Sequence, residues 1–83
     1  MNIYVGNLDY NIDEYDLRGI FEDYGNVENV SIIKDKYTGK SKGYGFVTMN
    51  NISEGKKAIE DLNGAQLENR EMVVNESRKK KKF

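Results

Sequence analysis

The sequence contains no cysteine, no histidine and no tryptophan among its 83 residues. Without cysteine there is no disulfide framework and no thiolate nucleophile, and without cysteine and histidine there is no zinc site of the usual ligands. The absence of histidine also removes the side chain that most often acts as a general base. The sequence therefore predicts a protein that is not an enzyme and that holds no metal and no cofactor.

Long hydrophobic runs are absent as well. Hydrophobic residues make up 37% of the chain and charged residues 33%, and the mean hydropathy is −0.80. This composition excludes an apolar run of 18 or more residues, so no membrane contact is expected. The first residues already have the pattern of a strand, which leaves no place for a secretory signal. We expect one small soluble domain in the cytoplasm, with a nuclear location as the alternative.

The charges are unevenly distributed along the chain. The net charge is −1, from 13 basic and 14 acidic residues, but five of the basic residues lie together at positions 78–82. Residues 1–77 therefore carry a net charge of −6. An acidic body is not typical of a nucleic-acid-binding protein, so such a function must depend on local geometry. We predict a domain over residues 1–77 and a flexible basic tail over residues 78–83.

Six segments of the sequence have a regular hydrophobic period, four of them the period of a strand and two the period of a helix. Asp13, with Asp16 three residues later, has the spacing of a capping box, and Ser53 is placed to cap a second helix. The polar stretch 35–42 is expected to be a hairpin loop. Strands are predicted over residues 2–5, 27–34, 43–49 and 72–76, helices over residues 13–24 and 53–62, and a short extended piece at residues 66–67.

This order, βαββαβ, predicts an α+β fold. Two amphipathic helices need one apolar sheet face to cover, so we expect a ferredoxin-like sandwich of a four-stranded antiparallel sheet backed by two helices. Strand alternation also turns Met49 and Gly45 toward the helices, where Gly45 would let a helix lie close. The expected core residues are Ile3, Val5, Leu17, Phe21, Val30, Ile32, Val47, Ile59, Leu62, Met72 and Val74.

The other face of this sheet is expected to carry aromatic side chains. Tyr4, Tyr44 and Phe46 project from the two strands at residues 2–5 and 43–49, away from the predicted core. Exposed rings at the centre of a sheet indicate a recognition surface. The alternative is that the rings only support the sheet by pairing across strands.

Two motifs lie on these strands. The run Ile3-Tyr4-Val5-Gly6-Asn7-Leu8 resembles the hexapeptide of the RNA recognition motif family, and Lys42-Gly43-Tyr44-Gly45-Phe46-Val47-Thr48-Met49 resembles its octapeptide. The resemblance covers residues 2–77. The chain is most similar to the single-domain glycine-rich RNA-binding proteins of bacteria and plants, although it lacks their glycine-rich tail. Met49 stands where the family usually has Phe or Tyr.

The resemblance implies a noncatalytic module that binds single-stranded RNA on its sheet, with single-stranded DNA as a weaker surrogate. Tyr4 and Tyr44 would then stack on successive bases, Phe46 would lie against the sugars or a neighbouring base, and Lys42 would contact a phosphate. No small-molecule substrate is implied. The full set of expected RNA-binding residues is Tyr4, Asn7, Lys34, Lys40, Lys42, Tyr44, Phe46, Asn75, Ser77 and Arg78.

Several alternatives stay open. Lys42 could be an ordinary solvated lysine, and Asn75 and Ser77 could either read base edges or simply end a strand. The basic residues 78–82 fit a phosphate-binding arm, a nuclear-localisation-like string or a solvated tail. The lysines around the loop at residues 35–42 are expected in front, with the acidic residues of the first helix behind the sheet. The alternative function is a protein-interaction domain of the same fold.

Overall fold

The computed structural model describes residues 1–77, so the predictions for the basic tail lie outside the described residues. Its elements follow the predicted βαββαβ order, with a small additional hairpin before the last strand. They are β1 (Asn2–Gly6), α1 (Glu14–Glu22), β2 (Val27–Lys34), β3 (Ser41–Met49), α2 (Ile52–Leu62), β4 (Gln66–Leu67), β5 (Arg70–Glu71) and β6 (Val73–Glu76).

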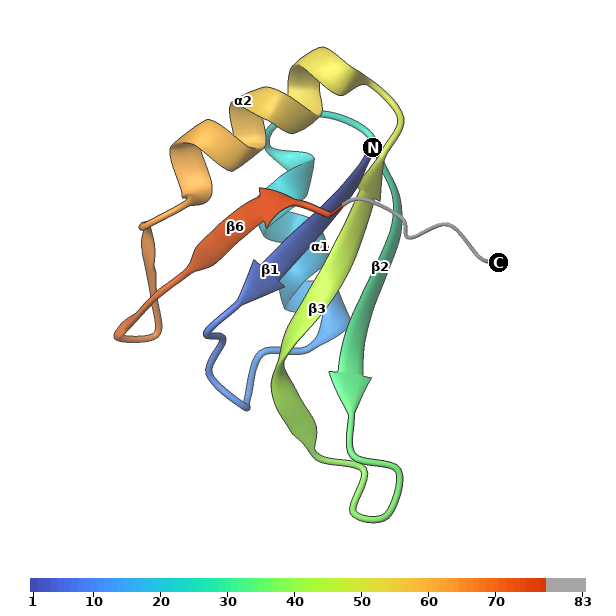
Figure 1. Cartoon of the computed structure of the whole chain (residues 1–83), viewed down its shortest axis with the longest axis vertical. Coiled ribbons are helices and arrows are strands. Elements are labelled where there is room, and N and C mark those ends of the chain that lie inside the picture. Colours follow the sequence, from blue (N-terminus) through green and yellow to red (C-terminus); the bar gives the residue numbers. More distant parts are fainter. Residues whose placement is uncertain (78–83) are drawn as a thin grey trace.

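The main sheet has four antiparallel strands in the order β2-β3-β1-β6. Figure 1 shows α1 crossing behind β1 and β3, with α2 on the β6 side of the molecule. The helices cover one face of the sheet and leave the opposite face open. The predicted ferredoxin-like sandwich is confirmed.

The core lies between this sheet and the two helices. Most of the predicted core residues are buried, and Met49 is fully buried, as strand alternation predicted. Val30 and Ile59 are only partly buried and pack against the edge of the core. Sequence reasoning did not include Leu8, Ile12, Val27 and Ala58, which are also buried. Leu8 and Ile12 lie in a loop, where no periodicity marks an inward side chain.

Both helices begin at a side-chain cap. In α1 the capping box is confirmed, because Asp13 Oδ1 accepts a hydrogen bond from the Asp16 N–H at 2.9 Å. In α2 the cap is Asn51, not Ser53, and its Oδ1 accepts from the Glu54 N–H at 2.9 Å. Asparagine is as good an N-cap as serine. The helix therefore begins two residues earlier than a serine cap implied.

The hairpin of β4 and β5 was missed, except for the extended piece at residues 66–67. Its strands pair Gln66 with Glu71 and Leu67 with Arg70. The two turn residues, Glu68 and Asn69, have φ angles of 54° and 69°, the left-handed conformations of a type I′ turn. Such turns usually contain Asn-Gly or Asp-Gly, and without that glycine the sequence carried no hairpin signal.

Gly45 faces the helix side of the sheet, as predicted, but the element that approaches it closely is a strand and not a helix. Gly45 is buried on the helix-facing side of β3. A side chain there would meet the backbone of Ser31 and Ile32 on β2, and no helix atom is among the three nearest. The missing side chain therefore allows a close approach of two strands, next to the register irregularity between Ile32 and Lys34.

Two exposed glycines separate the effect of space from the effect of backbone conformation. A Cβ added at Gly19 in α1 or at Gly39 in the β2–β3 loop meets nothing within 4 Å, but Gly39 has a φ of +76°. We expect Gly19→Ala to stabilise the protein by about 0.5 to 1 kcal/mol, since glycine is costly inside a helix. Gly39→Ala should destabilise it by about 1 to 2 kcal/mol, the cost of a left-handed L-residue. Urea denaturation measures both; shifts of the same sign would contradict the assigned conformations.

Candidate nucleic-acid interface

The open sheet face carries three aromatic rings in mutual contact. Tyr4 on β1 lies directly opposite Phe46 on β3, and Tyr44 lies two residues before Phe46 on the same face. The ring centroids are 5.8 Å apart for Tyr4 and Phe46, 6.0 Å for Tyr4 and Tyr44, and 6.2 Å for Tyr44 and Phe46. We call these three residues the aromatic platform.

The platform depends on a glycine in the same strand. A side chain at Gly6 would collide with the Tyr4 ring, so that ring lies over the glycine and leans along β1. The rings are tilted or edge-on to one another, at 36°, 63° and 87°, the arrangements that aromatic pairs prefer. All three are only partly buried. The rings support one another across the strands and still present surface to solvent, so both predicted roles fit the same geometry.

Polar side chains flank the aromatic platform on the outer strands. Asn75 on β6 lies opposite Tyr4, and Ser31 on β2 lies opposite Phe46. Asn75 is exposed, as its predicted base-reading role requires. The Ser77 N–H donates to the Asn2 carbonyl at 2.8 Å, so this N–H is already engaged and does not remain for a ligand.

A second polar pair lies next to the aromatic platform. The Thr48 hydroxyl donates to Asn2 Oδ1 at 2.9 Å, joining β3 to β1. Asn2, Thr48 and Ser31 were not among the expected RNA-binding residues, although alternation within β1, β3 and β2 places them on the open face. They add hydrogen-bonding groups around the rings.

Asn7 is held by the β4–β5 hairpin. Its Nδ2 donates to the Glu71 carbonyl at 2.8 Å, and its Oδ1 accepts from Arg70 Nη2 at 3.1 Å. Asn7 also has a φ of 57°, a left-handed conformation that asparagine tolerates better than most residues. The RNA-binding role predicted for Asn7 thus competes with a structural one. Its partner Arg70 is a candidate that was missed because the hairpin was missed.

The three lysines among the expected RNA-binding residues differ in their surroundings. Lys34, Lys40 and Lys42 are all exposed, but Lys34 Nζ lies 3.5 Å from Glu14 Oε1 on α1. Asp35 lies in the same loop, where hydrogen bonds from the Thr38 and Tyr37 N–H groups, with a smaller contribution from Lys42, lower its pKa. The predicted separation of lysines in front from acids behind is therefore incomplete.

Glu14 ties α1 to the edge strand β2. Its Oε2 accepts from the Ile32 N–H at 3.2 Å while its Oε1 meets Lys34. Desolvation, the largest single influence, raises the pKa of Glu14, but the hydrogen bonds from Ile32, its own N–H and Lys34 together outweigh it and lower the pKa. The ionised Glu14 carboxylate thus accepts a hydrogen bond from a backbone N–H of the edge strand β2. Without this contact, that N–H would be free to pair with a strand of another molecule.

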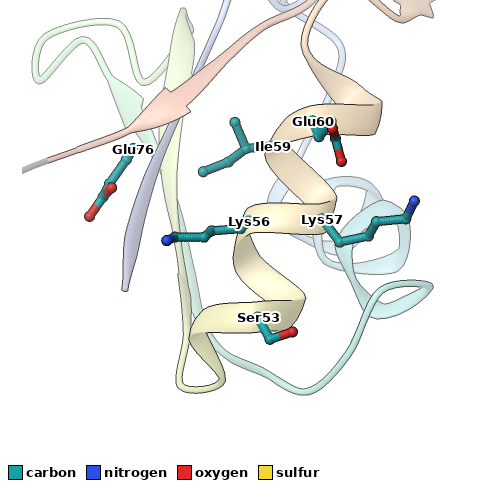
Figure 2. A pocket seen from close by; sticks show the side chains of 6 residues that line it. All are labelled: Ser53, Lys56, Lys57, Ile59, Glu60 and Glu76. Carbon is teal, nitrogen blue, oxygen red and sulfur yellow. The ribbon is translucent and has the colours of Figure 1, made fainter.

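A groove of about 580 Å³ lies on the other layer, between α2 and β6. Figure 2 shows Lys56 and Ile59 pointing toward β6, where Glu76 lies, and Lys57 pointing away from it. Glu76 pairs with the buried Ile3, so this groove is on the helix side of the sheet. Its two lysines are balanced by Glu60 and Glu76, so it offers little to a polyanion. Within residues 1–77, no cluster of acidic side chains could hold a metal ion, and neither helix could span a bilayer.

The fold and the site together define a class of protein. A four-stranded sheet backed by two helices, with a ring cluster on its uncovered face, is a ferredoxin-like module with a recognition surface on the sheet. A family model described as RNA recognition motif matches residues 3–73. The chain therefore belongs to the RNA recognition motif family, as its two sequence motifs indicated.

Individual relatives agree with this assignment. The Homo sapiens protein named Probable RNA-binding protein 23 is 49% identical over 74 residues, which is 89% of this chain and 17% of that protein. The crystal structure of RNA Binding Protein PG1 has a TM-score of 0.93 at 40% identity and covers 99% of both chains. The Rna15 RRM with bound RNA (GU) has a TM-score of 0.85 at 29% identity, over 94% of this chain and 83% of that one.

The Glu14 contacts predict a pH-dependent stability. Because the folded-state pKa of Glu14 is lowered, its contribution is fully present above the unfolded pKa and is lost as the pH falls through the folded pKa. We expect Glu14→Gln to lower the melting temperature at pH 7 and to converge on the parent protein in acid. Glu22→Gln is the control, since Glu22 forms only an exposed i,i+4 pair with Arg18 at 3.6 Å. A Glu14→Gln deficit that is equal at pH 7 and pH 2 would contradict the linkage.

Proposed function

We propose that this chain is a noncatalytic module that binds single-stranded RNA on the open face of its sheet. The observation that carries the proposal is the aromatic platform, three partly exposed rings within 6.2 Å of one another. Aromatic rings stack on any base, and each such contact contributes about 1 to 3 kcal/mol. The RNA-bound Rna15 structure, which has the same fold, supports the proposal. Single-stranded DNA offers the same base faces and serves as a weaker surrogate.

The residues around the aromatic platform take distinct roles in this proposal. Tyr4 and Tyr44 stack on successive bases, and Phe46 lies against the sugars or a neighbouring base. Asn75, beside Tyr4, hydrogen-bonds a base edge, and Lys42 contacts a phosphate. Phosphate contacts position the strand without reading its sequence, so preference for particular bases rests on the polar groups of the open face.

The remaining predicted site residues carry less of the proposal. Lys34 meets RNA only at the expense of its contact with Glu14, and Asn7 has both ends of its amide engaged by the β4–β5 hairpin. Arg78 lies outside the described residues, and its role stays a prediction, as does the cytoplasmic location. The protein-interaction alternative is not favoured, because the rings and the octapeptide lysine are all present at the positions that RNA binding needs.

Removing a ring from the aromatic platform should weaken RNA binding more than it weakens the fold. We expect Tyr4→Ala and Tyr44→Ala each to lower the affinity for single-stranded RNA by about 5- to 150-fold, the equivalent of 1 to 3 kcal/mol per stacked base. Fluorescence anisotropy with labelled U8, C8 and A8 measures the affinity, and thermal melting measures stability. Tyr44→Phe keeps the ring face and should bind nearly as well as the parent.

Tyr15→Ala is the matched control for these variants. Tyr15 lies on α1 with 84% of its surface exposed, so its loss should change neither affinity nor melting temperature. If Tyr4→Ala and Tyr44→Ala lowered the melting temperature sharply and left RNA affinity unchanged, the rings would be purely structural and the proposed function would be wrong.

A further inference from the structure

Asn63 and Gly64 form the only Asn-Gly pair in the sequence, and they lie in the turn where α2 ends. Asn63 is the C-cap of the helix, and its N–H donates to the Ile59 carbonyl at 3.0 Å. Gly64 has a φ of +91°, the left-handed conformation in which a helix commonly ends at a glycine. The turn therefore favours a glycine directly after this asparagine.

An Asn-Gly pair is chemically labile in water, because asparagine is a thermolabile residue and the following glycine has no side chain to hinder the reaction. The Gly64 nitrogen, on losing its proton, attacks Asn63 Cγ and forms a cyclic imide, while the Cγ–Nδ2 bond breaks. The side-chain nitrogen leaves as ammonia, which carries the proton that Gly64 lost. One water molecule then opens the imide at either carbonyl, giving aspartate or isoaspartate at position 63.

In the folded chain, hydrogen bonds hold both reacting groups. The Gly64 N–H donates to the Met72 carbonyl at 2.8 Å, and an amide held in this way loses its proton to solvent mainly when the bond opens. Asn63 Oδ1 accepts from the Val74 N–H at 3.0 Å, which ties the side-chain carbonyl to β6. The fold therefore restrains both the attacking nitrogen and the carbon that it attacks.

These two hydrogen bonds depend on the β4–β5 hairpin, which joins the end of α2 to β6 (Figure 1). The Met72 N–H donates to the Ala65 carbonyl at 2.8 Å and closes the base of the hairpin. Asn7 anchors the hairpin to the end of β1, since it donates to the Glu71 carbonyl and accepts from Arg70. Opening of the hairpin would remove the acceptor of the attacking nitrogen.

From these observations we propose that Asn63 is a deamidation site whose reaction rate is controlled by local opening of the β4–β5 hairpin. The inference does not depend on the proposed function. Each strand of the hairpin has only two residues, and three of the four are exposed. A segment with so little buried surface opens at a lower free-energy cost than the whole domain. Asn63 therefore reacts from a form in which the rest of the sheet is still folded.

Incubation of the full chain in buffer and in guanidinium chloride, at the same pH and temperature, tests the site and its protection. Peptide mass spectrometry follows the formation of aspartate and isoaspartate at each asparagine. In denaturant, Asn63 should react faster than every other asparagine. In the folded protein its rate should fall by about tenfold or more, since the reaction needs the open form. Asn63→Gln is the blank, because a glutamine side chain must close a larger ring.

Two results of this comparison would overturn the proposal. Equal rates at Asn63 in buffer and in denaturant would show that the native hydrogen bonds give no protection. A rate in denaturant no higher than that of the other asparagines would show that Asn63 is not a preferred site. Both results come from the parent protein, so they decide even where a variant fails to fold.

Two arginine variants locate the opening. Arg70→Ala removes the contact with Asn7 and should raise the folded-state rate at Asn63 by about three- to tenfold, as expected for the loss of one hydrogen bond. Arg18→Ala is the matched control. Arg18 Nη1 donates to the Val27 carbonyl at 3.0 Å, a contact outside the hairpin, so its loss should leave the rate within about twofold. Equal acceleration by both variants, or none by Arg70→Ala, would contradict control by the hairpin.

Discussion

One-sided burial of the sheet is the constraint on which the rest of the structure depends. Ile3, Val5, Val47 and Val74 are fully buried against the helices, and side chains alternate strictly between the faces of a strand. A slip of one residue in any strand would expose its core residues, so packing fixes the register. The same register sets Tyr4 opposite Phe46 and beside Asn75 on the far face. Packing of the core on one face of the sheet thus fixes the position of the aromatic platform on the opposite face.

The acidic body makes short-range contacts more important than the overall field. Residues 1–77 carry a net charge of −6, which slows the approach of a polyanion, although salt screens exposed charges beyond about 8 Å at physiological ionic strength. Part of this negative charge belongs to the Glu14 carboxylate, which accepts a hydrogen bond from β2 and lies beside Lys34. In the proposed function, stacking on the aromatic platform and contacts from nearby lysines act at distances shorter than this screening length. An acidic isoelectric point and RNA binding are compatible on this account.

Periodic features could be predicted from the sequence, and contacts between distant loops could not. Strand alternation placed Tyr4, Tyr44, Phe46 and Met49 on their correct faces, and the Asp13–Asp16 spacing located the first helix. The β4–β5 hairpin was missed because Glu68 and Asn69 adopt left-handed conformations without glycine. The Lys34–Glu14 pair and the approach of Tyr10 to Gly43 join segments far apart in sequence, and no local pattern encodes such contacts.

The central claim is that RNA occupies the open sheet face, and NMR mapping of backbone amides tests it most directly. An unlabelled U8, C8 or A8 oligonucleotide is titrated into uniformly ¹⁵N-labelled protein, and the shift of each assigned amide is recorded. The account predicts the largest shifts at Tyr4, Tyr44, Phe46 and Asn75, with Glu22 on α1 and Lys57 on α2 unchanged. Shifts confined to the two helices, with the four sheet residues unaffected, would contradict it.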